Sequence, residues 1–259
     1  VRALFAVVSR PEVVSLAGGM PYVAALPKDL LEKSYNSMME KKGLLAIQYG
    51  GGQGDLTLRD QVRELMALEG IRSSVEDIVM TTGSQHGLEL LSGLFIDEGD
   101  VVLAEGPSYV GALGIFRHYQ AHVEHVYTDH DGMSPEALEE AIDRLKEQGR
   151  TIKFLYLVPN FANPSGVTLA KERRPRILEI CRKNQILILE DNPYGLLYFD
   201  KPVPDAARVA MVAIGKPRIS GFMRPSEVLA KLPHVAVVVI DFYPVDTSRC
   251  ARISNKQEA

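Results

Sequence analysis

The sequence predicts an α/β fold in which a mostly parallel sheet is sandwiched by helices. Between residues 77 and 190, apolar runs of strand length alternate with amphipathic stretches of helix length, which is typical of parallel strands joined by helices. The chain has 259 residues, of which 46% are hydrophobic and 24% charged, so it can bury a sizeable core in one large domain or two small ones.

The expected helices and strands follow in a regular order. Two helices come first, at 28–41 and 56–69, with the glycine-rich loop 43–55 between them. Strands are then expected at 77–82, 101–105, 122–127, 153–159 and 186–190, and helices at 85–95, 109–118, 135–146 and 171–184. One of these helices has a clear start, because Ser134 can cap it and Pro135 suits its first position, where the missing N–H is harmless.

The character of the sequence changes after Phe199. Residues 209–214 and 235–240 read as strands, but the polar end of the chain has no pattern. We therefore expect residues 1–199 to form one portion of the protein and residues 200–259 to form a separate, divergent region.

Charge and composition argue against several classes of protein. The net charge of −4 and the pI of about 5.9 provide no basic surface for nucleic acid or an anionic membrane. No apolar run approaches the roughly 20 residues of a membrane span, and the chain begins at Val1 with no secretory leader, so we expect its natural start to be trimmed. Cys181 and Cys250 suggest neither a disulfide framework nor a zinc site, which favours a cytoplasmic location.

A carboxylate stands at the end of the last expected strand of the alternating region. Asp191 follows the apolar run 186–189, and a carboxylate is costly to bury unless a cation or a strong hydrogen-bond donor pairs with it. Because ligands of open α/β sheets gather at the carboxyl ends of the strands, we expect Asp191 to face a ligand that carries positive charge.

Other strand ends provide complementary groups. Gly83 and Ser84 open a helix whose N-terminus would attract phosphate, although they would equally suit an ordinary helix cap. Tyr109 could be a packing residue, and Asn163 in its Asn-Pro pair could be a turn residue. Taken together with Asp191, they form a phosphate cradle, an aromatic plate, an amide and a carboxylate. These groups match pyridoxal phosphate, whose protonated ring nitrogen the carboxylate would stabilise.

Six motifs carry a resemblance to a known family. In order, they are SLAGGMP, QYGGGQGDLTLR, TTGSQHGLEL, EGPSY, VPNFANPSG and EDNPYGLLYF. Their order and spacing over about residues 1–200 resemble the fold-type-I pyridoxal-phosphate-dependent aminotransferases. Within this family, the sequence is most similar to the branch of the 2-aminoadipate and kynurenine aminotransferases and the MocR regulators. The resemblance implies that residues 1–199 contain an N-terminal arm and the cofactor-binding part of the family's large domain.

The resemblance also implies roles for individual residues. Asp191 would pair with the ring nitrogen of the cofactor, and Tyr109 would stack on the ring. The other implied cofactor contacts are Gly83, Ser84 and Gln85 at the phosphate, Asn163 and Tyr194 at the phenolic oxygen, and Tyr49 at the phosphate of the neighbouring subunit of a homodimer. Gly18 and Gly19 would lie beside the substrate.

The lysine that carries the cofactor covalently in this family has no clear counterpart. Relatives place it in an S-x-S-K motif a few dozen residues after the aspartate, and that motif is absent. The nearest match is GKPRISGFMR, in which Lys216 is a candidate for the lysine and Arg224 for a phosphate-binding arginine. Relatives also continue well beyond position 259, so we expect the chain to be truncated or altered after about residue 200.

The function implied by the resemblance is transfer of an amino group from an amino acid to a 2-oxo acid, with pyridoxal 5'-phosphate as cofactor. Two alternatives stay open. One is a non-catalytic domain of MocR type that binds the cofactor or an amino acid, and the other is an inactive fragment without the lysine. A lysine that bonds the cofactor would distinguish the enzyme from both.

The histidines of the segment FRHYQAHVEHVY do not predict a metal site. His118 is expected at the end of a helix and His122 at the start of a strand, so the spacing that would join them on one helix does not form. No metal is therefore expected.

Overall fold

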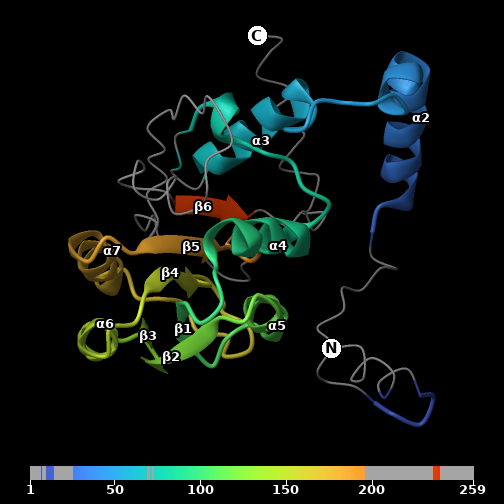
Figure 1. Ribbon diagram of the computed structural model, residues 1–259. Coiled ribbons are helices and arrows are strands. Elements are labelled where there is room, and N and C mark those ends of the chain that lie inside the picture. Colours follow the sequence, from blue (N-terminus) through green and yellow to red (C-terminus); the bar gives the residue numbers. More distant parts are fainter. Residues whose placement is uncertain are drawn as a thin grey trace. The chain divides into compact units, whose positions relative to one another are not determined.

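The computed structural model describes residues 10–14, 26–68, 73–195 and 236–239, together with Val7 and Ile71 (Figure 1). The chain divides into two compact units, one of which contains the residues up to Asp55 and the other those from Leu56 to Val245. Gly18, Gly19, Lys216 and Arg224 lie outside the described residues, as does the strand expected at 209–214.

The first unit contains helix α2, Lys28–Ala46, which has no buried residue. The expected end of this helix at residue 41 is wrong, because the first residues of the expected loop 43–55 are helical. Leu44, Leu45 and Ala46 favour helix strongly enough to extend it past Gly43.

The second unit is a layered α/β structure. Its helices are α3 (Leu56–Leu68), the short 3₁₀ helix η2 (Val75–Asp77), α4 (Ser84–Phe95), α5 (Val110–His118), α6 (Pro135–Glu147) and α7 (Arg173–Lys183). Its strands are β1 (Val101–Gly106), β2 (His122–Asp129), β3 (Gly132–Met133), β4 (Ile152–Leu157), β5 (Leu187–Asp191) and β6 (Ala236–Val239). The strands form one sheet in the order β3-β2-β1-β4-β5-β6. All neighbouring strands are parallel except β2 and β3.

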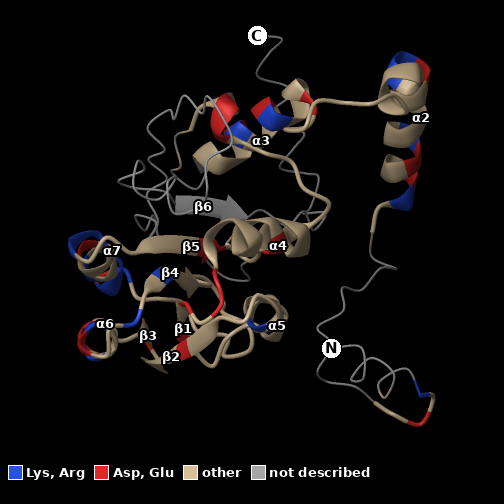
Figure 2. Cartoon of the chain, viewed as in Figure 1, with Lys and Arg blue, Asp and Glu red and all other residues tan. Residues whose placement is uncertain are grey.

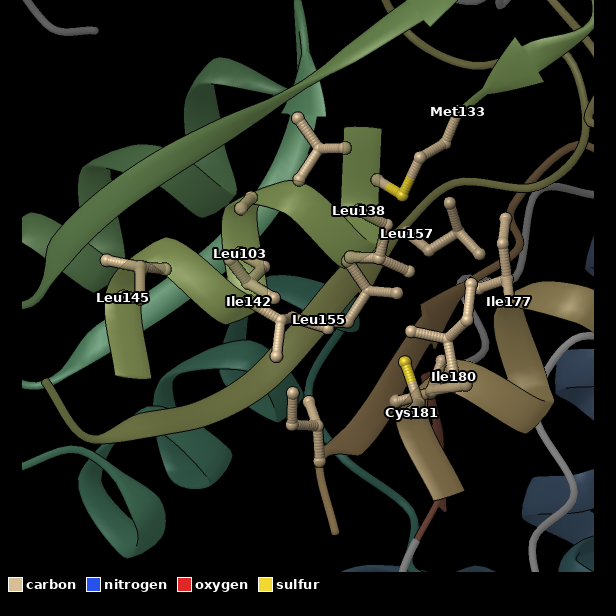
Figure 3. Close-up of a cluster of buried hydrophobic side chains, with 14 of the residues drawn as sticks. Leu103, Met133, Leu138, Ile142, Leu145, Leu155, Leu157, Ile177, Ile180 and Cys181 are labelled. Atoms are coloured by element: carbon tan, nitrogen blue, oxygen red, sulfur yellow. The ribbon is translucent and has the colours of Figure 1, made fainter. Parts of the chain in front are cut away.

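Helices cover both faces of this sheet, which confirms the expected fold class. Figure 1 shows α4 and α5 on one side of the strands and α6 and α7 on the other. On the α6 and α7 side, Leu138 and Ile142 pack with Ile177 and Cys181 against alternate residues of the strands (Figure 3). On the α4 and α5 side, a second buried cluster contains Leu88, Ala112, Phe116, Phe154, Tyr156 and Leu189. Burial of these apolar side chains is the main force that holds the layers together.

Charged residues lie on the outer surfaces of α6 and α7 (Figure 2). Arg176 of α7 donates to Glu136 of α6 over 2.5 Å, and Arg144 of α6 donates to Glu124 of β2 over 2.6 Å. Exposed ion pairs of this kind add little stability, so apolar packing beneath them holds the two helices in place.

Most of the expected elements are confirmed. The strand expected at 235–240 is confirmed as β6, which pairs with β5. Ser134 caps α6 as expected, because its Oγ accepts the N–H of Ala137 over 3.2 Å, with Pro135 in the first turn.

The strand expected at 77–82 is wrong. The 3₁₀ helix η2 occupies the start of this segment, and the residues after it form no strand. Ser74 and Asp77 stabilise η2 reciprocally, since the Ser74 N–H donates to Asp77 Oδ2 over 2.9 Å and Ser74 Oγ accepts from Glu76. Ile78 then packs with Val62 and Met66 of α3, so its apolar side chain is buried without a sheet partner.

Candidate active site

The candidate site lies at the carboxyl edge of the central strands. Strands β1, β4 and β5 are neighbours and run parallel, so their carboxyl ends meet at one edge of the sheet. Glu105 lies near the end of β1, Tyr156 near the end of β4 and Asp191 at the end of β5. All three side chains are buried.

Asp191 and Tyr156 form a buried hydrogen-bonded pair. The Tyr156 hydroxyl donates to Asp191 Oδ2 over 2.7 Å. Tyr156 is the register partner of Leu189, so Asp191 lies two residues further along β5 on the same face of the sheet. Asp191 is 5% exposed, and Tyr156 is fully buried.

The strong donor that a buried carboxylate requires is therefore a phenol. Burial raises the pKa of Tyr156 well above its usual value, and the negative charge of Asp191 raises the pKa further. Tyr156 consequently keeps its proton and acts as the donor. Sequence reasoning identified Asp191 but missed Tyr156, although the spacing of two residues between Phe154 and Tyr156 along β4 places both on one face.

Tyr109 lies at the start of α5 beside this pair. It precedes the first helical residue, Val110, and its partly buried side chain packs against the cluster that contains Tyr156. The ring of Tyr109 lies directly over Gly111, because a Cβ atom at Gly111 would stand only 2.5 Å from ring atoms. Glycine at position 111 therefore makes room for the aromatic ring two residues before it.

The backbone at the N-terminus of α4 is open at Gly83. Gly83 has a φ of 86°, which favours glycine, and nothing lies within 4 Å of the position that a Cβ atom would occupy. No acidic residue stands in the first turn of α4, which begins at Ser84. The positive end of the helix dipole is therefore not opposed by a carboxylate from this turn. Leu88, one turn later, belongs to the same buried cluster as Tyr156 and Leu189.

A buried polar network holds the loops that follow β4 and β5. Arg174 of α7 donates to the Leu169 carbonyl over 3.0 Å and to Asn160 Oδ1 over 2.9 Å. Asn160 in turn donates to Asn192 Oδ1 over 2.8 Å, and Asn192 directly follows Asp191. The network thus ties the first turn of α7 to the residue after the candidate carboxylate.

Glu105 is a second buried acid that sequence reasoning missed. Burial raises its pKa to about 7, although the Val158 N–H donates to Glu105 Oε2 over 2.9 Å and opposes the shift. Its charge also contributes to the raised pKa of Tyr156. The signal in the sequence was available, since Glu105 follows four apolar residues of the same strand.

The remaining expected site residues lie in less enclosed places. Gln85 and Asn163 are exposed, and Tyr194 is half-buried in the turn after β5. Tyr49 is 99% exposed and belongs to the other compact unit. The expected roles of these residues stay predictions.

The part of the chain that the structure describes contains no group of three or more His, Cys, Asp or Glu residues arranged to hold a metal ion. None of the described helices is both long enough and apolar enough to cross a membrane.

Comparison with known proteins connects this geometry to a family. The family described as aminotransferase class I and II matches residues 18–231. The chain is 37% identical over 205 residues to aromatic-amino-acid aminotransferase 1 of Thermococcus litoralis, covering 78% of this chain and 49% of the relative. It is 35% identical over 199 residues to 2-aminoadipate transaminase of Thermus thermophilus, covering 77% of this chain and 48% of the relative.

A solved structure gives the same result. Kynurenine aminotransferase of Pyrococcus horikoshii, crystallised in complex with PMP, is 36% identical and superposes with a TM-score of 0.72, covering 78% of this chain and 50% of that protein. The chain spans about half the length of the curated relatives that it matches. Because the family matches most of this sequence, the chain belongs to the class I and II aminotransferases.

Proposed function

We propose that this chain is the cofactor-binding portion of a pyridoxal-phosphate-dependent aminotransferase, which moves an amino group from an amino acid to a 2-oxo acid. The observation that carries the proposal is the buried Asp191 carboxylate, held by Tyr156 at the carboxyl edge of the sheet in a member of this family. An ionised group in such a place is costly unless it serves a ligand or a fixed partner.

The described residues fit pyridoxal phosphate. Asp191 offers an anion to the ring nitrogen, and the half-buried Tyr109 offers an aromatic face. Gly83, Ser84 and Gln85 lie at a helix N-terminus that suits a phosphate. Among the described residues, Ser108 Oγ is buried and has no hydrogen-bond partner, so a polar atom beside Tyr109 is still to be satisfied.

Each of these residues would contribute a separate part of the chemistry. When bound, pyridoxal phosphate supplies an electron sink through its protonated ring nitrogen. Asp191 would accept a hydrogen bond from that N–H and keep the proton in place. Asn163 and Tyr194 would hold the phenolic oxygen, and Tyr109 would cover the ring and exclude water from it.

Further features of the whole enzyme belong to the same proposal. We propose a cytoplasmic homodimer in which Tyr49 reaches the phosphate of the neighbouring subunit and Gly18 and Gly19 border the substrate. Lys216 is the candidate for the lysine that bonds the cofactor, and Arg224 is the candidate for a second phosphate contact. The names of the relatives favour an aromatic amino acid or 2-aminoadipate as the amino donor.

The division of the chain into two regions is also part of the proposal. Residues 1–199 would carry the arm and the cofactor site, and residues 200–259 would form a divergent region. Strand β6 of that region pairs with β5, which places at least this strand in the same sheet as Asp191.

Chemical trapping tests the proposal. The purified chain is mixed with pyridoxal phosphate, its visible absorption is recorded, and the sample is reduced with borohydride before peptide mapping by mass spectrometry. We expect a label on Lys216 that is absent in Lys216→Ala and present in the matched control Lys231→Ala. If the chain binds no pyridoxal phosphate and its mixture with the cofactor shows no visible absorption band of a bound cofactor, the result would contradict the proposal and favour an inactive fragment.

A second candidate function has one observation in its favour. The chain is 26% identical to the HTH-type transcriptional regulator NorG of Staphylococcus aureus, a match that covers 74% of this chain. A binding domain without turnover would take up pyridoxal phosphate reversibly and show no labelled lysine after borohydride. That outcome would replace the enzyme by a ligand-sensing domain.

A further inference from the structure

We propose that Tyr156 is a positioning residue, which holds the Asp191 carboxylate in the orientation in which it meets the ring nitrogen of the cofactor. The inference rests on the proposed function. It concerns only the hydroxyl group of Tyr156, because phenylalanine would keep the same aromatic ring and lack only this hydroxyl.

The hydroxyl is fixed by the packing of its ring. Tyr156 has no exposed surface, and its ring meets that of Phe116 edge to face at 5.3 Å between centroids and 72° between planes. Phe116 packs in the same way on Phe154, at 5.4 Å and 72°. A side chain with two rotatable bonds in such a core holds its hydroxyl in one place. The bond of 2.7 Å to Asp191 Oδ2 therefore fixes one oxygen of the carboxylate.

The same bond determines which partner carries the proton. Burial and the charge of Asp191 raise the pKa of Tyr156 far above its usual value, so Tyr156 remains a neutral donor. A neutral donor stabilises the ionised form of its acceptor, which is the form that would hold a protonated ring nitrogen.

A purely structural role for Tyr156 makes a different prediction. A hydroxyl that serves only the stability of the core would affect cofactor binding in the same way whether or not residue 191 is a carboxylate. A hydroxyl that acts through Asp191 loses its effect when the carboxylate is removed.

Pyridoxamine phosphate is a suitable probe because it binds without a bond to lysine. Its dissociation constant, and the absorbance and fluorescence that distinguish a protonated from a neutral ring nitrogen, are measured for wild type, Tyr156→Phe, Asp191→Ala and the double variant. We expect Tyr156→Phe to weaken binding about tenfold and to shift the spectrum toward the neutral ring, as for loss of a hydrogen bond to a charged group. In the Asp191→Ala background, the same change should have no further effect. The matched control Tyr127→Phe removes a hydroxyl from a tyrosine that is 66% exposed on β2, and it should bind as wild type does.

Failure of this inference and failure of the proposed function give different results. If wild type binds and Tyr156→Phe binds equally well with an unchanged spectrum, the inference is overturned while the proposed function stands. Equal losses in both backgrounds overturn it too. If wild type does not bind, the proposed function fails, and the same four proteins are compared by urea unfolding without cofactor. Additive effects of the two substitutions would then overturn the inference, and clear coupling would uphold the Tyr156–Asp191 part of it.

Discussion

At the scale of single residues, the site depends on three buried side chains at the strand ends, Glu105, Tyr156 and Asp191. Asp191 could be anticipated from the sequence because an acidic pair, Glu190 and Asp191, stands out directly after an apolar run. Glu105 carries the same kind of signal, because it follows four apolar residues of β1, but the hydrogen bond of Tyr156 could not be recognised in this way, because Tyr156 lies within an apolar strand. Their roles depend on cross-strand neighbours, which a sequence pattern does not specify.

Gly111 offers a direct test of how Tyr109 is placed. Gly111→Ala should displace the Tyr109 ring, since the new methyl group would overlap it, and should weaken pyridoxamine phosphate binding by up to about tenfold through lost ring stacking. Gly114→Ala is the matched control on the same helix, because nothing lies within 4 Å of its Cβ position. Isothermal titration compares the two variants. Equal binding by Gly111→Ala and wild type would show that Tyr109 does not cover the cofactor.

Glu105 should make stability depend on pH. Its pKa is about 7 in the folded protein and about 4.5 when unfolded, so the folded state holds the extra proton between these values. Stability therefore falls as the pH rises through this range, by at most about 3 kcal/mol. Glu105→Gln, which imitates the protonated acid, should remove this fall.

Urea unfolding between about pH 5 and pH 8 measures the effect. The exposed Glu140 on α6 provides the control, because Glu140→Gln should keep the pH dependence of wild type. A Glu105→Gln protein whose stability still falls with pH as steeply as wild type would show that another group is responsible.

At the scale of helices and strands, local sequence signals predict where a helix starts, but they do not predict which element an apolar segment packs against. Ser134 and Pro135 set the start of α6, as the sequence indicates. The apolar residues Ile78, Val79 and Met80 predict a strand at 77–82. In the structure, the Ser74–Asp77 cap stabilises η2 instead, and Ile78 is buried against α3 rather than in a sheet. The apolar residues at 78–80 predict burial, but their pattern does not identify the element against which they pack.

Arg174 should be the residue on which the loops beside the site depend most. It is 2% exposed and donates to the carbonyls of Pro159 and Leu169 and to Asn160. Arg174→Met should destabilise the protein by about 3 kcal/mol, because buried acceptors lose their donor. Chemical denaturation provides the measurement.

Arg176 on the same helix is the control for this loss. Its side chain is 54% exposed and pairs with Glu136 at the surface, so Arg176→Met should cost less than about 1 kcal/mol. Similar losses for the two variants would mean that the buried network adds nothing beyond an ordinary surface contact.

At the scale of the whole molecule, the family and the α/β architecture could be predicted because six separate motifs agree in order. The covalent lysine could not, because the S-x-S-K pattern is absent and Lys216 lies outside the described residues. The chain also spans only about half the length of the curated relatives that it matches. What this chain does encode is the strand edge with Asp191 and the helix start at Ser84.

A crystal structure of the chain with pyridoxamine phosphate is the sharpest test of the proposed cofactor site. We expect one molecule whose ring nitrogen lies within hydrogen-bonding distance of the Asp191 carboxylate and whose phosphate lies at the first turn of α4. A ring nitrogen turned away from Asp191, or a phosphate bound elsewhere, would contradict it.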